Sequence, residues 1–325
     1  MRRVLCLLVL STSLASMGCD PEAVEVDEPV VVIEEDNKGT MANNPAPNAE
    51  QNQQPDANMG NTNTGMLDNS TSPFRDCPVE ARPIYVIDAN DYTLFSFDPL
   101  ERQFDMVGNV SQCPATTPGA TPFSMAVDRD ANAWVLYTNG ELFIYNIPSG
   151  DCFSTVYNGD RNFFLYGMGF VLDSPASSTD VLYIAGSGDG PGGDAPSQVG
   201  QVNFAESSYE VIGGLDGDPE LTGTAAGELW GFFPSTSPPK VAQIDRETGA
   251  LGTTFPVTGI DGQPNAWAFA FWGGDFWLFY KSQDDPSTRV FQLDAQTGAV
   301  DQIIDDSGLY IVGAGVSTCA PLVVE

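Results

Sequence analysis

Short apolar runs, rich in aromatic residues, alternate with polar turns throughout residues 80–325. Gly, Asp and Pro separate these runs, and no stretch carries the 3.6-residue period of an amphipathic helix. The pattern is typical of antiparallel β-structure, in which short strands are joined by tight turns. We therefore predict an all-β domain.

The apolar runs recur at a nearly constant interval. Five of them, "RPIYVID", "NAWVLY", "VLYIAG", "ELWGFF" and "DFWLFY", centre on Tyr85, Trp134, Tyr183, Trp230 and Trp277. Successive centres are 49, 49, 47 and 47 residues apart. A period in the high forties, with about four strands in each unit, indicates the blades of a β-propeller.

Within a unit, a strand of small residues precedes the aromatic strand, as in "FSMAVD", "GMGFVLD", "ELTGTA" and "WAFAFW". Small side chains suit the innermost strand, where blades crowd the axis. The chain begins with strands two to four of a unit (83–110) and ends with a lone innermost strand, "YIVGAGVS". We predict five four-stranded antiparallel blades, with the C-terminal strand joining the N-terminal strands to close the ring. Six blades are the alternative. We expect the insertion "GSGDGPGGDAPS" to be a surface loop.

The N-terminus has the pattern of an export signal. Arg2 and Arg3 precede the apolar run "VLCLLVL", which is too short to span a membrane, so residues 1–18 are predicted to be a signal peptide. The sequence "SMGC" resembles a bacterial lipobox and predicts lipid modification of Cys19, although Ser16 stands where leucine is common. The alternative is cleavage after "SLA", which would give a secreted protein without an anchor.

Residues 19–76 are acidic at first and then rich in Asn, Pro and Gln. Such a segment cannot bury enough apolar surface to fold, so we predict a disordered tether between the lipid and the propeller domain, residues 77–325. The expected location is the bacterial cell envelope, and the sequence leaves the membrane and its leaflet open.

Cysteine spacing predicts two disulfides. After loss of Cys6 with the signal, the exported chain keeps Cys19, Cys77, Cys113, Cys152 and Cys319. Lipidation of Cys19 leaves four thiols that can pair in an oxidising compartment. Cys319 follows the last strand and Cys77 precedes the first, so their bond would staple the ring. Cys113 and Cys152 remain for each other, although a regular blade places Cys113 on the opposite face, so we expect the loop "SQCPATTPG" to fold over.

Charge narrows the possible functions. The chain holds 44 acidic and 12 basic residues and no histidine, for a net charge of −32. Binding to nucleic acids and to anionic lipid surfaces depends on clusters of Lys and Arg, so we expect neither, and the lipid anchor would be the only membrane contact. Without histidine there is no Ser-His-Asp or Cys-His pair and no His-ligated zinc.

The mouth of the propeller axis is the candidate ligand site. The leading residues of the innermost strands should ring it: Ser124, Tyr166, Glu220, Asn265, Trp267 and Tyr310. Aromatic rings with an acid and an amide suit a glycan, through stacking and hydroxyl hydrogen bonds. The competing interpretation is that the aromatic side chains pack between blades and the polar groups satisfy the backbone.

Metal and cofactor motifs are weak. Asp128 and Asp130 are interpreted as turn caps rather than metal ligands. The segments "GLDGDPE", "GIDGQP" and "SGDGPGGD" suggest calcium, but none has the spacing of a calcium-binding loop. "GSGDGPGG" lacks the spacing of a phosphate-binding loop. We expect no cofactor, and calcium stays open.

The strand–turn–strand unit "FSMAVDRDANAWVL" resembles those of secreted NHL-type and gluconolactonase-like propellers. The set "TPFSMAVDR", "ELTG", "WAFAFWGGDFW" and "IVGAGVSTCAP", behind a lipobox and an acidic linker, is similar to a group of myxobacterial lipoproteins. The resemblance covers nearly all of residues 77–325. It implies a propeller at the cell envelope and implies no activity.

Three functions remain open. The first is a non-catalytic binding or scaffold module for a glycan or an envelope protein. The second is a glycoside hydrolase or metal-dependent hydrolase at the mouth; a glycosidase needs two carboxylates about 5–9.5 Å apart, and Glu220 and Asp218 are the nearest pair. The third is a structural protein whose partner binds the outer surface of the blades.

Overall fold

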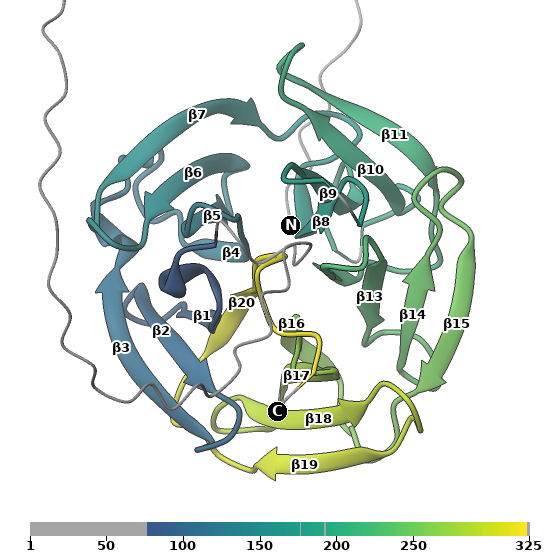
Figure 1. Ribbon diagram of the computed structural model, residues 1–325. Helices are drawn as coiled ribbons and strands as arrows, with labels where there is room; N and C mark the ends of the chain where they lie inside the picture. Colours follow the sequence, from purple (N-terminus) through teal and green to yellow (C-terminus); the bar gives the residue numbers. More distant parts are fainter. Residues whose placement is uncertain (1–76, 176, 192, 324–325) are drawn as a thin grey trace, which may run out of the picture. The chain divides into compact units, whose positions relative to one another are not determined.

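The computed structural model describes residues 77–323 apart from 176 and 192. The predicted signal peptide, Cys19 and the tether lie outside the described residues. The described part forms five four-stranded antiparallel blades arranged as a β-propeller, which confirms the predicted fold (Figure 1). It contains two 3-10 helices, η1 (Val79–Ala81) and η2 (Val110–Gln112), and no helix in it is long and apolar enough to cross a membrane.

Each blade is given from the axis outward. Blade 1 contains β20 (Ile311–Gly315), β1 (Ile84–Asp88), β2 (Thr93–Asp98) and β3 (Gln103–Asn109). Blade 2 contains β4 (Pro122–Val127), β5 (Asn132–Tyr137), β6 (Glu141–Asn146) and β7 (Cys152–Asn158). Blade 3 contains β8 (Leu165–Leu172), β9 (Asp180–Ser187), β10 (Gln198–Asn203) and β11 (Ser208–Gly214).

Blade 4 contains β12 (Glu220–Gly223), β13 (Leu229–Phe233), β14 (Lys240–Ile244) and β15 (Leu251–Pro256). Blade 5 contains β16 (Pro264–Trp272), β17 (Asp275–Ser282), β18 (Arg289–Asp294) and β19 (Val300–Ile304). The predicted insertion in blade 3 begins with the last two residues of β9, Gly186 and Ser187, and its other described residues form the loop that joins β9 to β10.

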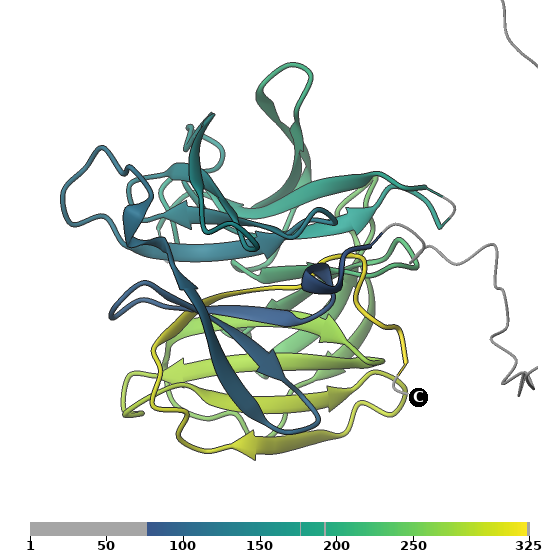
Figure 2. The ribbon, with the colours of Figure 1, turned by 60° about the vertical axis from the view of Figure 1, so that its left-hand side comes forward.

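The two ends of the chain close the ring. Strand β20 pairs antiparallel with β1, with Tyr85 opposite Gly315, as the lone C-terminal strand predicted. Beyond β20 the Ser317 hydroxyl donates to the Ala81 carbonyl at 2.6 Å, and Cys319 is bonded to Cys77. Figure 2 shows η1, in dark blue, beside the yellow segment that follows β20. Hydrogen bonds and a covalent bond therefore both hold the closure.

The second disulfide, Cys113–Cys152, also forms, and strand twist explains how. Strands twist progressively across a sheet, so the outermost strands β3 and β7 run along the rim of the ring rather than along its axis (Figure 1). The end of β3 therefore lies near the start of β7 in the next blade. The predicted Cys113–Cys152 bond is therefore confirmed, and a face assignment based on flat blades does not prevent it.

The core lies between blades. Within the described residues, five large apolar clusters each join two neighbouring blades. Between blades 4 and 5, for example, the ring centroid of Phe276 lies 4.9 Å from that of Trp230 and 5.4 Å from that of Phe269. Large aromatic side chains thus fill the wedge that opens outward from the axis.

The innermost strands approach backbone to backbone. A Cβ atom on Gly223 of β12 would lie 2.0 Å from the carbonyl oxygen of Phe170 in β8. On Gly167 of β8 it would lie 2.2 Å from the carbonyl oxygen of Pro219. Both separations are far below van der Waals contact, so blades 3 and 4 meet at a distance that glycine alone permits. The prediction of small residues at the axis is confirmed.

We expect Gly223→Ala to lower the free energy of unfolding by about 3 kcal/mol or more, because β8 and β12 must separate to admit the methyl group. Urea unfolding followed by tryptophan fluorescence would measure the loss. Gly214→Ala is the matched control, because a Cβ there meets nothing within 4 Å. Equal losses in the two variants would contradict close packing at the axis.

The two disulfides give a second test. Each bridge joins one buried and one half-buried cysteine, so replacing either pair with alanine removes similar contacts. The bonds close loops of 242 and 39 residues, and loop entropy then predicts that losing Cys77–Cys319 costs about 1.6 kcal/mol more than losing Cys113–Cys152. Denaturant unfolding of the two double variants would measure this difference. A greater cost for the shorter loop would show that loop entropy does not govern the closure.

Candidate functional site

The two ends of the ring differ in which loops they carry. The link face carries the loops that join the outermost strand of one blade to the innermost strand of the next, such as 159–164, 215–219 and 257–263. The turn face carries the turns that leave the innermost strands, such as 128–131 and 224–228, together with the residues after β20. The predicted mouth residues lie at the link-face ends of the innermost strands.

Three of the six predicted mouth residues are buried. Ser124, Tyr166 and Glu220 are at most 3% exposed. Trp267 and Tyr310 are half-buried, and Asn265 is exposed. Close approach of the innermost strands therefore buries the side chains of blades 2, 3 and 4 at this end, while those of blade 5 and of the link to β20 stay accessible.

Glu220 forms a buried hydrogen-bonded pair with Ser124. The Ser124 hydroxyl donates to a Glu220 carboxyl oxygen at 3.0 Å, and the backbone N–H of Met168 donates to the same carboxyl group. Burial raises the pKa of Glu220 well above its usual value of 4.5, although both hydrogen bonds act to lower it. The pair ties β4, β8 and β12 together at the axis.

Tyr166 packs between blades. Its hydroxyl lies 3.0 Å from the Tyr209 hydroxyl, and its ring meets Tyr209 edge-on at 5.8 Å between centroids. Burial, followed by the charge and hydrogen bond of Tyr209, raises the pKa of Tyr166 well above its usual value. Tyr166 thus matches the competing interpretation, in which the aromatic side chains are part of the core.

The accessible part of the predicted mouth is a small cluster in and beside blade 5. The Asn265 side-chain amide donates to the Tyr310 hydroxyl at 3.1 Å, and the Lys281 ammonium lies 5.7 Å from the centre of the Tyr310 ring. Trp267 is half-buried and packs against the cluster between blades 4 and 5. This arrangement leaves an amide, a hydroxyl and parts of two rings open to solvent.

The carboxylates proposed for hydrolysis are not both accessible. Glu220 is 3% exposed, whereas Asp218 is half-buried and one of its oxygens has no hydrogen-bond partner. A substrate could not reach Glu220 without separating the innermost strands.

Among the other acidic residues noted in the sequence, Asp128 has a local structural role, and the function of the Asp-rich loops stays open. Asp128 accepts from the backbone N–H groups of Asp130 and Asn132 and from the Trp134 indole, which confirms it as a turn cap. Within the described residues, no group of three or more Asp, Glu or Cys side chains is placed to hold a metal ion. Whether the Asp-rich loops bind calcium stays open.

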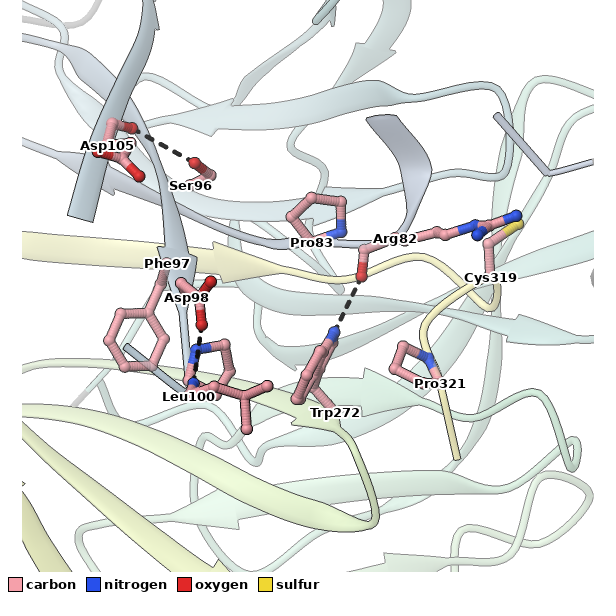
Figure 3. Close-up of a pocket in the computed structure, with 11 residues that line it drawn as sticks. Arg82, Pro83, Ser96, Phe97, Asp98, Leu100, Asp105, Trp272, Cys319 and Pro321 are labelled. Atoms are coloured by element: carbon pink, nitrogen blue, oxygen red, sulfur yellow. Dashed lines mark hydrogen bonds between the residues drawn. The ribbon is translucent and has the colours of Figure 1, made fainter. Parts of the chain in front are cut away.

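A cavity lies on the turn face, where blade 5 meets blade 1 (Figure 3). This seam cleft has a volume of about 570 Å³. It is lined by Arg82, Pro83, Ser96, Phe97, Asp98, Pro99, Leu100, Asp105, Trp272, Cys319 and Pro321. None of the predicted mouth residues lines it. Most of its wall is apolar, and three prolines make that wall stiff.

Trp272 and Leu100 are the most prominent apolar side chains of the seam cleft, and local hydrogen bonds fix the position of each. Trp272 ends β16, and its indole donates to the Arg82 carbonyl at 3.1 Å. The Asp98 carboxylate accepts from the backbone N–H groups of Leu100 and Glu101, which fixes the turn between β2 and β3. Leu100 is left 63% exposed, and Figure 3 shows Trp272 between it and Pro321.

Charged groups of both signs rim the apolar wall. Arg82 is exposed beside Cys319, and Asp98 and Asp105 are exposed on the side of blade 1. An adjoining smaller cavity shares Leu100 and Trp272 with the cleft and adds Arg102. An apolar cleft with a charged rim is suited to an amphipathic ligand.

The sequence alone did not single out the seam cleft. Trp272 belongs to the innermost-strand segment "WAFAFW", where a tryptophan does not fit the pattern of small residues, and two glycines follow it. Those glycines, Gly273 and Gly274, both have positive φ and make the turn that leaves Trp272 at the end of the strand. The misplaced tryptophan before a tight turn was the available signal.

No family model and no curated protein matches the chain. Solved structures that match it include a chain of a nidogen–laminin complex (TM-score 0.44, 10% identity, 71% of this chain and 97% of that one). A second is TolB from Acinetobacter baumannii, with a TM-score of 0.41 and 14% identity over 70% of this chain and 54% of that one. A third is a gluconolactonase from Xanthomonas campestris, with a TM-score of 0.43 and 15% identity over 70% of this chain and 74% of that one. At this identity the similarity concerns the propeller fold alone. The resemblance to myxobacterial lipoproteins stays a prediction.

The buried Glu220 makes stability depend on pH in a defined direction. Since its folded pKa is raised, the folded protein holds a proton that the unfolded chain releases above about pH 4.5. The protonated Glu220 therefore makes its full contribution to the free energy of unfolding below about pH 4.5, and this contribution is lost as the pH rises toward the pKa of Glu220 in the folded protein. We expect Glu220→Gln to gain stability relative to the wild type as pH rises from 4.5 to about 7.

Urea unfolding across this pH range would measure the effect, with the exposed Glu206→Gln as the control. An unchanged difference in stability between wild type and Glu220→Gln at all pH values would mean that Glu220 ionises normally in the fold.

Proposed function

We propose that the protein is an exported binding module whose propeller holds a protein partner at the seam cleft, without catalysis. The cleft itself supports this proposal: it places an exposed leucine and a half-buried tryptophan beside an exposed arginine. Trp and Arg are enriched among the residues that contribute most to protein interfaces. A 63% exposed Leu100 at the rim of an apolar cavity is a surface that gains from being covered.

A protein partner suits the cleft better than a glycan does. Its walls are formed largely by proline, leucine and phenylalanine side chains, which offer few hydrogen-bond partners for sugar hydroxyls. The Trp272 indole N–H is already used by the Arg82 carbonyl. Apolar side chains of a partner would instead fill the cavity and cover Leu100.

Glycan binding on the link face is the second candidate, supported by Asn265, Trp267 and Tyr310, which stay accessible there. A hydrolase has less support, because its proposed carboxylate Glu220 is buried and bonded to Ser124.

Placement at the cell envelope completes the proposal. The two disulfides are consistent with an exported protein. Lipid on Cys19 would attach the chain to a membrane, and residues 19–76 would hold the propeller clear of it.

Photo-crosslinking in the cells that make the protein would test the proposal. A photo-reactive amino acid at position 100 should crosslink a discrete protein. The same probe at position 251, which is 37% exposed on blade 4, should not. With the crosslinked partner purified, Leu100→Asp should raise its Kd at least tenfold, because a charge would enter the apolar interface.

The glycan candidate needs a separate measurement. Saturable binding of the purified protein to a polysaccharide, lost on Trp267→Ala, together with no crosslink at position 100, would overturn the protein-binding proposal. Repeating the binding with calcium and then with a chelator would test whether the Asp-rich loops bind calcium.

A further inference from the structure

A second cavity lies on the turn face between blades 2 and 3. It has a volume of about 400 Å³, and we refer to it as the acidic–aromatic pocket. Its wall includes Asp128, Arg129, Asp130, Trp134, Asp180 and Phe204. These residues come from four places: the turn after β4, strand β5, the start of β9, and the turn between β10 and β11.

Aromatic rings form one wall of the pocket. Phe204 is 44% exposed, although it is a large apolar residue, and its ring centre lies 5.4 Å from that of Trp134. Trp134 in turn packs edge-on against Phe170 at 5.8 Å and is held by the hydrogen bond from its indole to Asp128. The exposed ring therefore rests on a fixed aromatic support.

Asp180 carries an unmet hydrogen-bonding requirement. One of its carboxylate oxygens accepts from the Thr318 hydroxyl at 2.7 Å, whereas the other, Oδ2, is buried without a partner. A buried carboxylate oxygen without a donor is costly, and native structures contain few such atoms. Burial also raises the pKa of Asp180 to about 6, against the opposing effects of Thr318 and Arg129. A charged hydrogen-bond donor from a ligand would give Oδ2 a partner and would stabilise the ionised form of Asp180, which burial disfavours.

The charge in the pocket favours a cation. Asp128, Asp130 and Asp180 outnumber the single guanidinium of Arg129, which is itself engaged and donates to the Thr318 hydroxyl at 3.1 Å. An aromatic face beside carboxylates is the usual environment for a bound ammonium or guanidinium group. The net charge of −32 would also attract a basic partner from a distance.

We propose that the acidic–aromatic pocket binds a basic side chain, a guanidinium or ammonium group, with Asp180 as its carboxylate partner and Phe204 as its aromatic partner. This inference rests on the proposed function, because it identifies the partner protein as one that presents Arg or Lys. Thr318 and Cys319 are neighbours in sequence. Thr318 contacts the pocket through Asp180, and Cys319 lines the seam cleft, so both sites adjoin the segment that follows β20.

Titration calorimetry of the purified protein with argininamide tests the proposal. Citrulline amide is the matched neutral ligand, since it keeps the shape of the side chain and lacks the charge. We expect saturable binding of argininamide and none of citrulline amide. Asp180→Asn should weaken binding at least tenfold, and Asn can still accept from Thr318. Phe204→Ala should weaken it by about three- to fivefold. Asp173→Asn, an exposed carboxylate outside the pocket, should leave it unchanged.

Absence of argininamide binding, equal binding of citrulline amide, or binding that Asp180→Asn leaves intact would each overturn the proposal. Thermal unfolding of each variant would show whether it is folded at the temperature used. The crosslinking experiment at position 100 does not involve this pocket. If a partner crosslinks at position 100 and argininamide does not bind, the proposal for the acidic–aromatic pocket is rejected and the proposed function of the seam cleft is kept.

Discussion

The contact of the innermost strands at the axis is the constraint on which the rest of this structure depends. Blades 3 and 4 approach so closely that a methyl group on Gly223 would overlap the backbone of β8. The same approach buries Glu220 against Ser124 and keeps Tyr166 inside the wall between blades. An axis packed in this way has little room for a ligand at its blade 3 and 4 side. Accessible cavities are instead found farther out, where blades diverge.

The closure of the ring explains why the seam cleft lies where blade 5 meets blade 1. Blade 1 combines β20 with β1–β3, whereas the four strands of every other blade are consecutive in sequence. Residues that belong to no repeat, among them Arg82 and Pro321, therefore gather at this junction and shape the seam cleft. The Cys77–Cys319 bond fixes that segment, so the cleft is formed before any partner arrives. A preformed site avoids part of the entropy cost of binding.

The repeat predicted the blades, their number and the way the ring closes because those features follow from local alternation and a fixed period. Cysteine order predicted both disulfides, whereas the strand twist that brings Cys113 near Cys152 is invisible in a linear pattern. The mouth was harder to predict. Whether Ser124 and Glu220 face solvent or each other depends on the separation of two strands 96 residues apart in sequence. The seam cleft depends on an even longer contact, that between Trp272 and Arg82 across 190 residues.

The segment after β20 links the seam cleft and the acidic–aromatic pocket, which both lie on the turn face. Ser317 bonds to Ala81 in blade 1, Thr318 to Asp180 in blade 3, and the Gly273 amide of blade 5 donates to Pro321. A segment that only completed blade 1 would not need partners in two other blades. These bonds hold an apolar cleft and an acidic pocket in a fixed relation to one segment. A partner with an apolar group and a basic group could engage both, and would gain from each without reordering the propeller.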